Sequence, residues 1–161
     1  MPAINSAVEL LDEYASGVRH FSRSNLQDAY LPSARLVAAD LSWGHLTKAH
    51  LANANLWRAN LDWANLVAAD LSGAQLVSTH LNWANLSQAC LAGADLKHAN
   101  LEWSNLVAAD LRAIHLHQAN LVEACYSYQT IFPDGFDPAA AGMIQVDVNE
   151  LPNRPSTGIV H

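Results

Sequence analysis

The residues of this chain that could do chemistry are mainly histidines and carboxylates near its C-terminal third. His115 and His117 are two residues apart, and Asp95 and His98 precede them. Imidazole nitrogens and carboxylate oxygens are ligands that zinc accepts, so His115, Asp95 and His98 form a candidate metal site. Lys97 lies beside them, and its positive charge opposes the binding of a cation. We therefore expect solvated surface histidines here, with a weak metal-binding site as an alternative.

Other patterns that support catalysis are missing from the sequence. It contains no Ser-His-Asp arrangement, no glycine-rich phosphate loop and no CxxC pair. Cys90 and Cys125 are too few for a disulfide framework, and neither has an obvious base beside it. Catalysis also needs groups that converge in a concave site, whereas the repeats described next build flat surfaces. We expect a protein that is not an enzyme and that uses no cofactor.

Charge and hydropathy bear on two further classes of function. The 161 residues carry a net charge of −7. Eight acidic and six basic side chains lie within residues 21–128, so this region contributes only −2 and offers no basic patch for direct nucleic-acid binding. No stretch approaches the roughly 20 apolar residues of a membrane span, and MPAINSAVELLDEY lacks the features of a secretory signal. We expect a cytoplasmic protein that binds neither membranes nor nucleic acid directly.

The elements that position these side chains follow a repeat of five residues. Leucine occupies every fifth position from Leu26 to Leu121, and we call this position i. The residue at i−2 is small, most often alanine, and the residue at i−1 is often Asn or Asp. A helix would rotate each leucine by about 140° from the last, and a plain strand would alternate faces, so neither buries the series. A coil with one flat side per unit does so, with i and i−2 pointing inward and the other three positions outward.

A longer spacing concerns the surface. Trp43, Trp63, Trp83 and Trp103 are twenty residues apart, and each stands at i+2. The segment LDWANLVAADL returns as LEWSNLVAADL after forty residues. On a four-sided solenoid, the four tryptophans would fall on one side of the rod, one per coil. On a three-sided solenoid they would scatter, so the spacing independently favours four sides.

The A(N/D)Lxx units resemble those of the pentapeptide-repeat proteins over residues 19–128. This resemblance implies an all-β solenoid, specifically a right-handed quadrilateral parallel β-helix with four units per coil and about 5.5 coils here. Ile114 is a bulky residue at i−2. We expect the tube to widen locally around it.

Both ends of such a tube would expose apolar side chains and strand edges, so both need covers. The stretch ELLDEYASGVRHF resembles the N-terminal cap helix of family members from photosynthetic bacteria, and we expect residues 1–18 to form this cap. Ser6 and Glu9 predict a capping box, and Gly17 predicts the helix end. We therefore expect a short α-helical cap before the repeats.

The regular repeat ends near Gln129. Residues 129–144 resemble the family's C-terminal close and predict a cap, in which Ile131, Phe132 and Phe136 cover the last coil. Residues 145–161 have no clear period, and we expect them to form a loose tail.

The tryptophans are the candidate interaction surface. Indoles about 4.8 Å apart can stack and tie the coils together, and exposed apolar strips rich in Trp often mark contact surfaces. The same side carries acidic residues at its edge. We expect a non-catalytic protein-interaction scaffold with an unidentified protein partner. Its candidate surface comprises Trp43, Trp63, Trp83, Trp103, Asp62 and Glu102.

Two alternatives to the scaffold function stay open. Some pentapeptide-repeat proteins mimic DNA and bind DNA gyrase, a topoisomerase, so the resemblance implies this function as a candidate. Those proteins are acidic along the rod and dimerise through a C-terminal helix, and neither property is evident in this sequence. The metal site around His115 is the second alternative. A homodimer through the tryptophan side is an oligomeric state compatible with the exposed strip.

Overall fold

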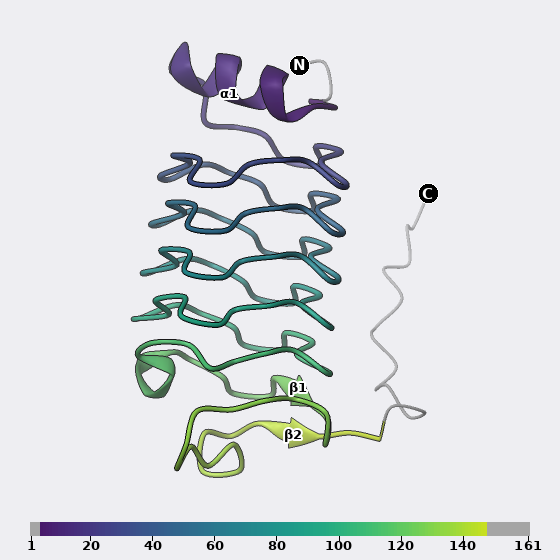
Figure 1. Cartoon of the computed structure of the whole chain (residues 1–161), viewed down its shortest axis with the longest axis vertical. Helices are drawn as coiled ribbons and strands as arrows, with labels where there is room; N and C mark the ends of the chain where they lie inside the picture. Colours follow the sequence, from purple (N-terminus) through teal and green to yellow (C-terminus); the bar gives the residue numbers. More distant parts are fainter. Residues whose placement is uncertain (1–3, 148–161) are drawn as a thin grey trace, which may run out of the picture.

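The computed structural model describes residues 4–147. In chain order its elements are helix α1 (Ala7–Ala15), the short 3₁₀ helix η1 (Leu116–Gln118), and strands β1 (Cys125–Tyr126) and β2 (Ile144–Gln145). Between α1 and β2 the chain runs in stacked coils that form a rod, with α1 at one end and the β1–β2 pair at the other (Figure 1). Among the described residues, no helix is long and apolar enough to span a membrane.

The coils are joined along their sides by parallel bridges between residues twenty positions apart. Asp40 pairs with Asn60, and Asn60 pairs with His80. Four five-residue units therefore complete one turn, and the rod is a four-sided parallel β-helix. Each side contributes only a single bridging residue to most pairings, so the regular structure consists mainly of isolated bridges rather than long strands.

The backbone of each unit is hydrogen-bonded in a fixed pattern. The N–H groups at i and i+2 donate to carbonyls of the next coil, and the N–H at i−1 donates to the previous coil. The N–H at i−2 donates to the carbonyl of the leucine before it, which closes a tight turn. In the unit that begins at Leu61, the N–H groups of Leu61 (i) and Trp63 (i+2) lie 2.8 and 2.9 Å from their acceptors. Those of Asn65 (i−1) and Ala64 (i−2) lie 2.9 and 3.1 Å from theirs. Only the N–H at i+1 lacks a backbone acceptor in this pattern.

The Asn or Asp at i−1 supplies the missing acceptor. Asn60 Oδ1 accepts from the backbone N–H of Asp62 at 3.0 Å, and Asp70 Oδ1 accepts from that of Ser72 at 3.0 Å. A backbone donor without a partner is unfavourable, so this short side chain stabilises the turn in the units that carry it. The recurrent Asn and Asp of the repeat thus have a structural cause.

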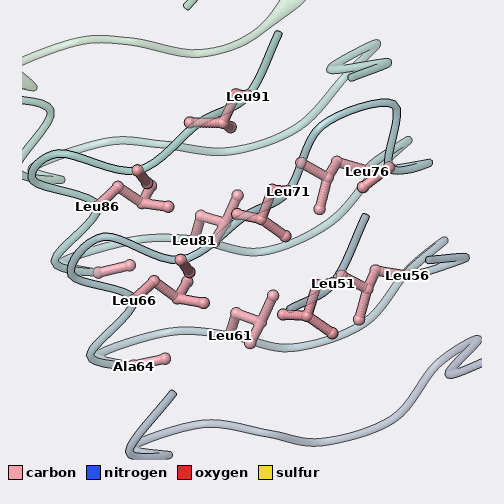
Figure 2. Close-up of a cluster of buried hydrophobic side chains, with 14 of the residues drawn as sticks. Leu51, Leu56, Leu61, Ala64, Leu66, Leu71, Leu76, Leu81, Leu86 and Leu91 are labelled. Atoms are coloured by element: carbon pink, nitrogen blue, oxygen red, sulfur yellow. The ribbon is translucent and has the colours of Figure 1, made fainter. Parts of the chain in front are cut away.

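The core is a continuous file of leucine and alanine side chains. Figure 2 shows the leucines of successive sides pointing into the interior, with Leu51, Leu71 and Leu91 above one another in consecutive coils. These three side chains are fully buried. The inward orientation predicted for i and i−2 is confirmed along the regular part of the rod, since the alanines at i−2 are buried with the leucines.

Ile114 does not widen the tube, and that prediction was wrong. Its side chain is 51% exposed, while Ala113 is buried and takes the inward position. The side is one residue shorter here, because Asp95 pairs with Ile114, nineteen rather than twenty positions later. His115, whose φ is 59°, and the adjoining η1 then add one residue to the following segment, so the twenty-residue register is restored. The chain therefore shifts its register and keeps the bulky residue outside.

Helix α1 lies across the first coil. The backbone N–H of Glu9 donates to Ser6 Oγ at 3.2 Å, as predicted, but the Glu9 carboxylate accepts from the N–H of Asn5 instead of Ser6. Gly17 follows the helix with a φ of 101°, in agreement with the predicted helix end. Leu10 is fully buried in the core that continues into the rod.

The C-terminal close differs from its prediction at one residue. Phe132 and Phe136 pack against the core, but Ile131 is exposed. Asp110 pairs with Ile131, twenty-one positions later, so one additional residue enters this side. Thr130 consequently points inward, and its hydroxyl donates to the carbonyl of Leu106 at 2.9 Å.

The last strand extends the coils slightly beyond the predicted boundary. β2 pairs with β1 in parallel, which places Gln145 opposite Tyr126. The N–H of Val146 donates to the Tyr126 carbonyl at 2.8 Å. Gln145 and Val146 therefore belong to the final coil rather than to a tail. Residues 148–161 of the predicted tail lie outside the described residues.

Candidate interaction surface

Four tryptophans form a single column on one side of the rod, hereafter the Trp column: Trp43, Trp63, Trp83 and Trp103. Consecutive indole rings have centroids 4.9, 5.0 and 5.0 Å apart and interplanar angles of 3°, 3° and 4°. The predicted stacking is confirmed. Each aromatic pair contributes roughly 0.5–1.5 kcal/mol beyond its buried area, so the Trp column links four coils at the surface as the leucines do inside.

The tight turn of each unit determines where these indoles lie. All four tryptophans have left-handed backbone conformations, with φ between 60° and 63°. This conformation is unfavourable for residues other than glycine. The backbone N–H of each tryptophan donates to a backbone carbonyl of the next coil. That of Trp63, for example, donates to the carbonyl of Asn82 at 2.9 Å. Because the same turn recurs every twenty residues, the rings stack directly upon one another.

The outer edges of the Trp column are open to solvent. Trp43 and Trp103, at its ends, are each 42% exposed, and the two inner tryptophans are half-buried by their stacked neighbours. Within residues 4–147, none of the four indole N–H groups donates a hydrogen bond to a protein group. The column therefore presents four ring edges and four donors to a partner.

Asp62 lies beside the Trp column and has a structural role there. Its Oδ1 accepts from both the backbone N–H and the side-chain Nδ2 of Asn82, each at 2.8 Å. Asn82 stands at i+1, and the i−1 residue of its unit is His80, which has no side-chain oxygen to accept the i+1 N–H. Asp62 thus replaces the missing acceptor from one coil away. Its Oδ2 has no hydrogen-bond partner within residues 4–147.

Glu102 occupies the same column of i+1 positions. Its Oε2 accepts from Asn120 Nδ2 at 3.4 Å, and the same amide donates to Asn100 Oδ1 at 2.9 Å. Both predicted acidic residues are therefore on the tryptophan side and are held by amides of an adjacent coil. An apolar centre bordered by fixed polar groups is the usual composition of a protein interface.

Sequence comparison identifies the repeat directly. The family model for pentapeptide repeats matches residues 45–82, 79–118 and 94–125, in eight copies. Together the matches cover 45–125, which is half of the chain and includes three of the four tryptophans. The chain belongs to the pentapeptide-repeat family. Proteins of this family generally act as structural or interaction proteins rather than as enzymes.

Solved structures of pentapeptide-repeat proteins are similar to this chain. Rfr23 from the cyanobacterium Cyanothece 51142 is 26% identical over 79% of this chain and 99% of its own, with a TM-score of 0.73. The protein alr5209 from Nostoc PCC 7120 is 31% identical over 91% and 100%, with a TM-score of 0.40. HetL, involved in heterocyst differentiation regulation in Nostoc sp. strain PCC 7120, is 32% identical over 78% and 63%, with a TM-score of 0.40. The comparison with curated proteins gave no match.

The histidines of this pentapeptide-repeat rod form a pair with an aspartate but not a cluster of ligands. His115 Nδ1 lies 2.9 Å from Asp95 Oδ1, so these two side chains are neighbours, as predicted. The ring of His117 is nearby, with its centroid 6.4 Å from that of His115. Within residues 4–147, however, no three His, Cys, Asp or Glu side chains are arranged to hold a metal ion. His98 therefore does not complete the predicted site.

The acidic residues with altered pKa values lie away from the Trp column. Partial burial raises the pKa of Asp95, but hydrogen bonds from His115 and from the Lys97 N–H lower it more, so the net pKa is below its usual value. The bidentate hydrogen bond from Arg112, at 3.0 and 2.6 Å, lowers the pKa of Asp110. Both shifts arise from local pairing and indicate no catalytic group.

A fifth exposed tryptophan is absent from the predicted surface. Trp57 stands at i+1 on the preceding side of the coil and is 41% exposed. The guanidinium carbon of Arg58 lies 4.5 Å from its ring centroid. Its outward i+1 position was the available signal, but it lies outside the twenty-residue series that identified the Trp column. Among the described residues it makes no ring stack, which makes it a matched control for the column.

Proposed function

We propose that this protein is a non-catalytic protein-interaction scaffold that binds a protein partner through the Trp column. One observation carries the proposal: four parallel, solvent-accessible indoles, exposed at the two ends of the column and half-buried between them, whose N–H groups have no protein acceptor within residues 4–147. Stacking accounts for the contacts between coils but leaves the outer ring edges in water. A continuous exposed apolar strip is typical of a contact surface, and tryptophan is enriched at the residues that dominate binding.

The rigidity of the surface supports the same proposal. Each indole is confined by its stacked neighbours and by a backbone that is hydrogen-bonded to the next coil. A partner would therefore restrict little additional side-chain freedom on binding. Asp62 Oδ2 and Glu102 add hydrogen-bond acceptors along one edge, which would orient the partner.

The proposal includes closure of both ends of the rod, so that its sides are the surfaces left for binding. In this proposal about 5.5 coils lie between the helical N-terminal cap, residues 1–18, and the C-terminal cap, residues 129–144. Burial of Leu10 at one end and of Met143 at the other supports it. Such covers would prevent open association through strand edges.

Co-purification from a lysate of the native host tests the proposal. The tagged wild-type chain would be compared with a Trp63→Ser/Trp83→Ser variant and with Trp57→Ser as the control on another side. We expect the double variant to lose the proteins that the wild type captures, while Trp57→Ser retains them. Circular dichroism and denaturant unfolding would establish that all three chains are folded. Capture of the same proteins by all three would contradict the proposal.

A further inference from the structure

The Trp column ends in side chains of opposite charge. One coil before Trp43 the same i+2 position holds Arg23, and one coil after Trp103 it holds Glu123. Both share the left-handed backbone of the tryptophans, with φ of 63° and 60°. Their N–H groups continue the same pattern, since that of Arg23 donates to Ser42 at 2.8 Å and that of Glu123 to the next segment at 2.9 Å. The column thus runs from a cation, through four indoles, to an anion.

This order is complementary to its own reverse. If a second copy lies antiparallel, with its Trp column against the first, Arg23 faces Glu123 of the second copy at each end. Trp43 then faces Trp103 of the second copy, and Trp63 faces its Trp83. Such an arrangement has two-fold symmetry, in which each contact occurs twice and the interface closes on itself.

The neighbouring column of i+1 positions is compatible with the same arrangement. Reversal places Asp62 opposite Asn82 of the second copy, and Ser42 opposite its Glu102. Each carboxylate therefore meets an amide or a hydroxyl group, which can donate a hydrogen bond, rather than another carboxylate. The antiparallel arrangement opposes no two like charges along either column.

A parallel arrangement lacks this complementarity. It would place Arg23 against Arg23 of the second copy at one end and Glu123 against Glu123 at the other. Like charges that face each other across an interface disfavour association and select against that orientation. The charges at the ends of the column therefore favour an antiparallel second copy over a parallel one.

We propose that this protein forms an antiparallel, two-fold symmetric homodimer through the Trp column, with reciprocal pairs between Arg23 and Glu123. The proposal rests on the proposed function of this surface and names a second copy of the chain as its occupant. The strip from Arg23 to Glu123 spans five coil rises, or about 25 Å. This is short for a stable interface, so the dimer dissociates at protein concentrations in the micromolar range.

Sedimentation velocity of the full chain over a wide range of concentrations tests the dimer. We expect the mass to rise from one chain toward two as concentration increases. The Trp63→Ser/Trp83→Ser variant should stay monomeric at concentrations where the wild type and Trp57→Ser are dimeric. A wild type that is monomeric throughout, or a dimer that the double variant retains, would overturn the proposal.

Charge reversal tests the antiparallel direction. Arg23→Glu opposes two acidic pairs and Glu123→Arg opposes two basic pairs, so each single variant should weaken the dimer by about tenfold or more. The combined variant restores opposite charges in the antiparallel dimer, and its dissociation constant should return to within about threefold of the wild type. In a parallel dimer the combined variant would still oppose like charges. Failure of the combined variant to recover would overturn the proposed arrangement.

The dimer and the broader function can fail separately. A monomeric wild type that loses its captured proteins on Trp63→Ser/Trp83→Ser overturns the dimer and supports the proposed function. A dimer that the double variant abolishes, while Trp57→Ser leaves it intact, supports the dimer itself. A dimer that persists in the double variant, with unchanged captured proteins, contradicts both.

Discussion

At the scale of single residues, Ser104 is an exception in the core. It stands at the inward i−2 position, where the repeat favours alanine, and its buried hydroxyl has no hydrogen-bond partner within the described residues. Ser104→Ala removes that buried polar group without opening a large cavity. We expect the free energy of unfolding to rise by about 1 kcal/mol, as measured by denaturant titration.

Thr79 is the control for this prediction. It occupies the same inward position, but its hydroxyl donates to the carbonyl of Leu56 at 2.8 Å. Thr79→Ala should therefore lower the free energy of unfolding by about 1 kcal/mol. If Ser104→Ala and Thr79→Ala change the stability in the same direction, the difference between satisfied and unsatisfied hydroxyls is not what determines these positions.

The lowered pKa of Asp95 implies that the stability of the protein depends on pH. The pKa of this carboxyl is lowered in the folded state by His115 and the Lys97 N–H. Its contribution to stability is therefore present above its unfolded pKa, near 3.9, and is lost as the pH falls through the lower folded-state value. Asp95→Asn should reduce the stability at neutral pH by up to about 1 kcal/mol, because the group is partly exposed.

The measurement is the unfolding midpoint in denaturant between neutral pH and strong acid. Asp95→Asn preserves an acceptor for the Lys97 N–H but cannot titrate, so the difference between it and the wild type should vanish in strong acid. His115→Ala removes the other partner and should bring the pKa of Asp95 nearer to its ordinary value. A constant difference between Asp95→Asn and the wild type at every pH would exclude the proposed origin of this stability.

At the scale of the unit, the left-handed i+2 residue determines the shape of the turn. Ala68 occupies this position with a φ of 55°, and the next residue, Ala69, points into the core and is 1% exposed. The left-handed conformation costs alanine about 1–2 kcal/mol, more than the roughly 0.5–1 kcal/mol of chain freedom that glycine loses on folding. Ala68→Gly should therefore increase the free energy of unfolding by up to about 1 kcal/mol.

The adjacent residue provides a matched comparison. Ala69→Gly removes a buried methyl group and relieves no left-handed strain, so it should destabilise the protein by about 1 kcal/mol or more. Denaturant unfolding of both variants measures the contrast. Destabilisation of comparable size in both would show that the turn does not strain Ala68.

Much of the unit was predictable because one spacing governs several properties. A period of five assigns the inward and outward positions, and the twenty-residue spacing of Trp63 and Trp83 gives the number of sides. The role of Asp62 was less accessible, because it requires knowing that the i+1 N–H has no backbone acceptor and that His80 cannot supply one. That information lies in the hydrogen bonds between coils rather than in the repeat.

The register shift was hidden for a different reason. The chain is one residue short where Asp95 pairs with Ile114, and it recovers that residue before the next corner. Leu116 and Leu121 therefore remain in phase with the five-residue series, and the sequence shows no interruption. Ile114 is exposed because a bulky side chain fits poorly at the inward i−2 position. Whether it fits depends on the packing of the coils, which the repeat pattern does not contain.

At the scale of the whole molecule, each coil touches mainly its two neighbours, so stability is approximately a sum of coil and contact terms. The Trp column adds surface contacts to that sum. Trp63 stacks on both Trp43 and Trp83, whereas Trp103 stacks only on Trp83. Trp63→Ser should thus lose roughly 1–3 kcal/mol of stacking, and Trp103→Ser roughly half as much.

Unfolding free energies of the two single variants measure this difference, with Trp57→Ser as a control that breaks no stack between tryptophans.

The ratio of the two stability losses bears directly on function. A column needed only for folding and a column needed for association predict different effects of substituting Trp103, at the end of the column. If stability alone matters, Trp103→Ser should be milder than Trp63→Ser in every assay. If the column binds a partner along its length, Trp103→Ser should impair association more than its small loss of stability explains, since its ring is more exposed than that of Trp63 and offers more contact area. Association of Trp103→Ser at wild-type strength would restrict the binding surface to the inner tryptophans.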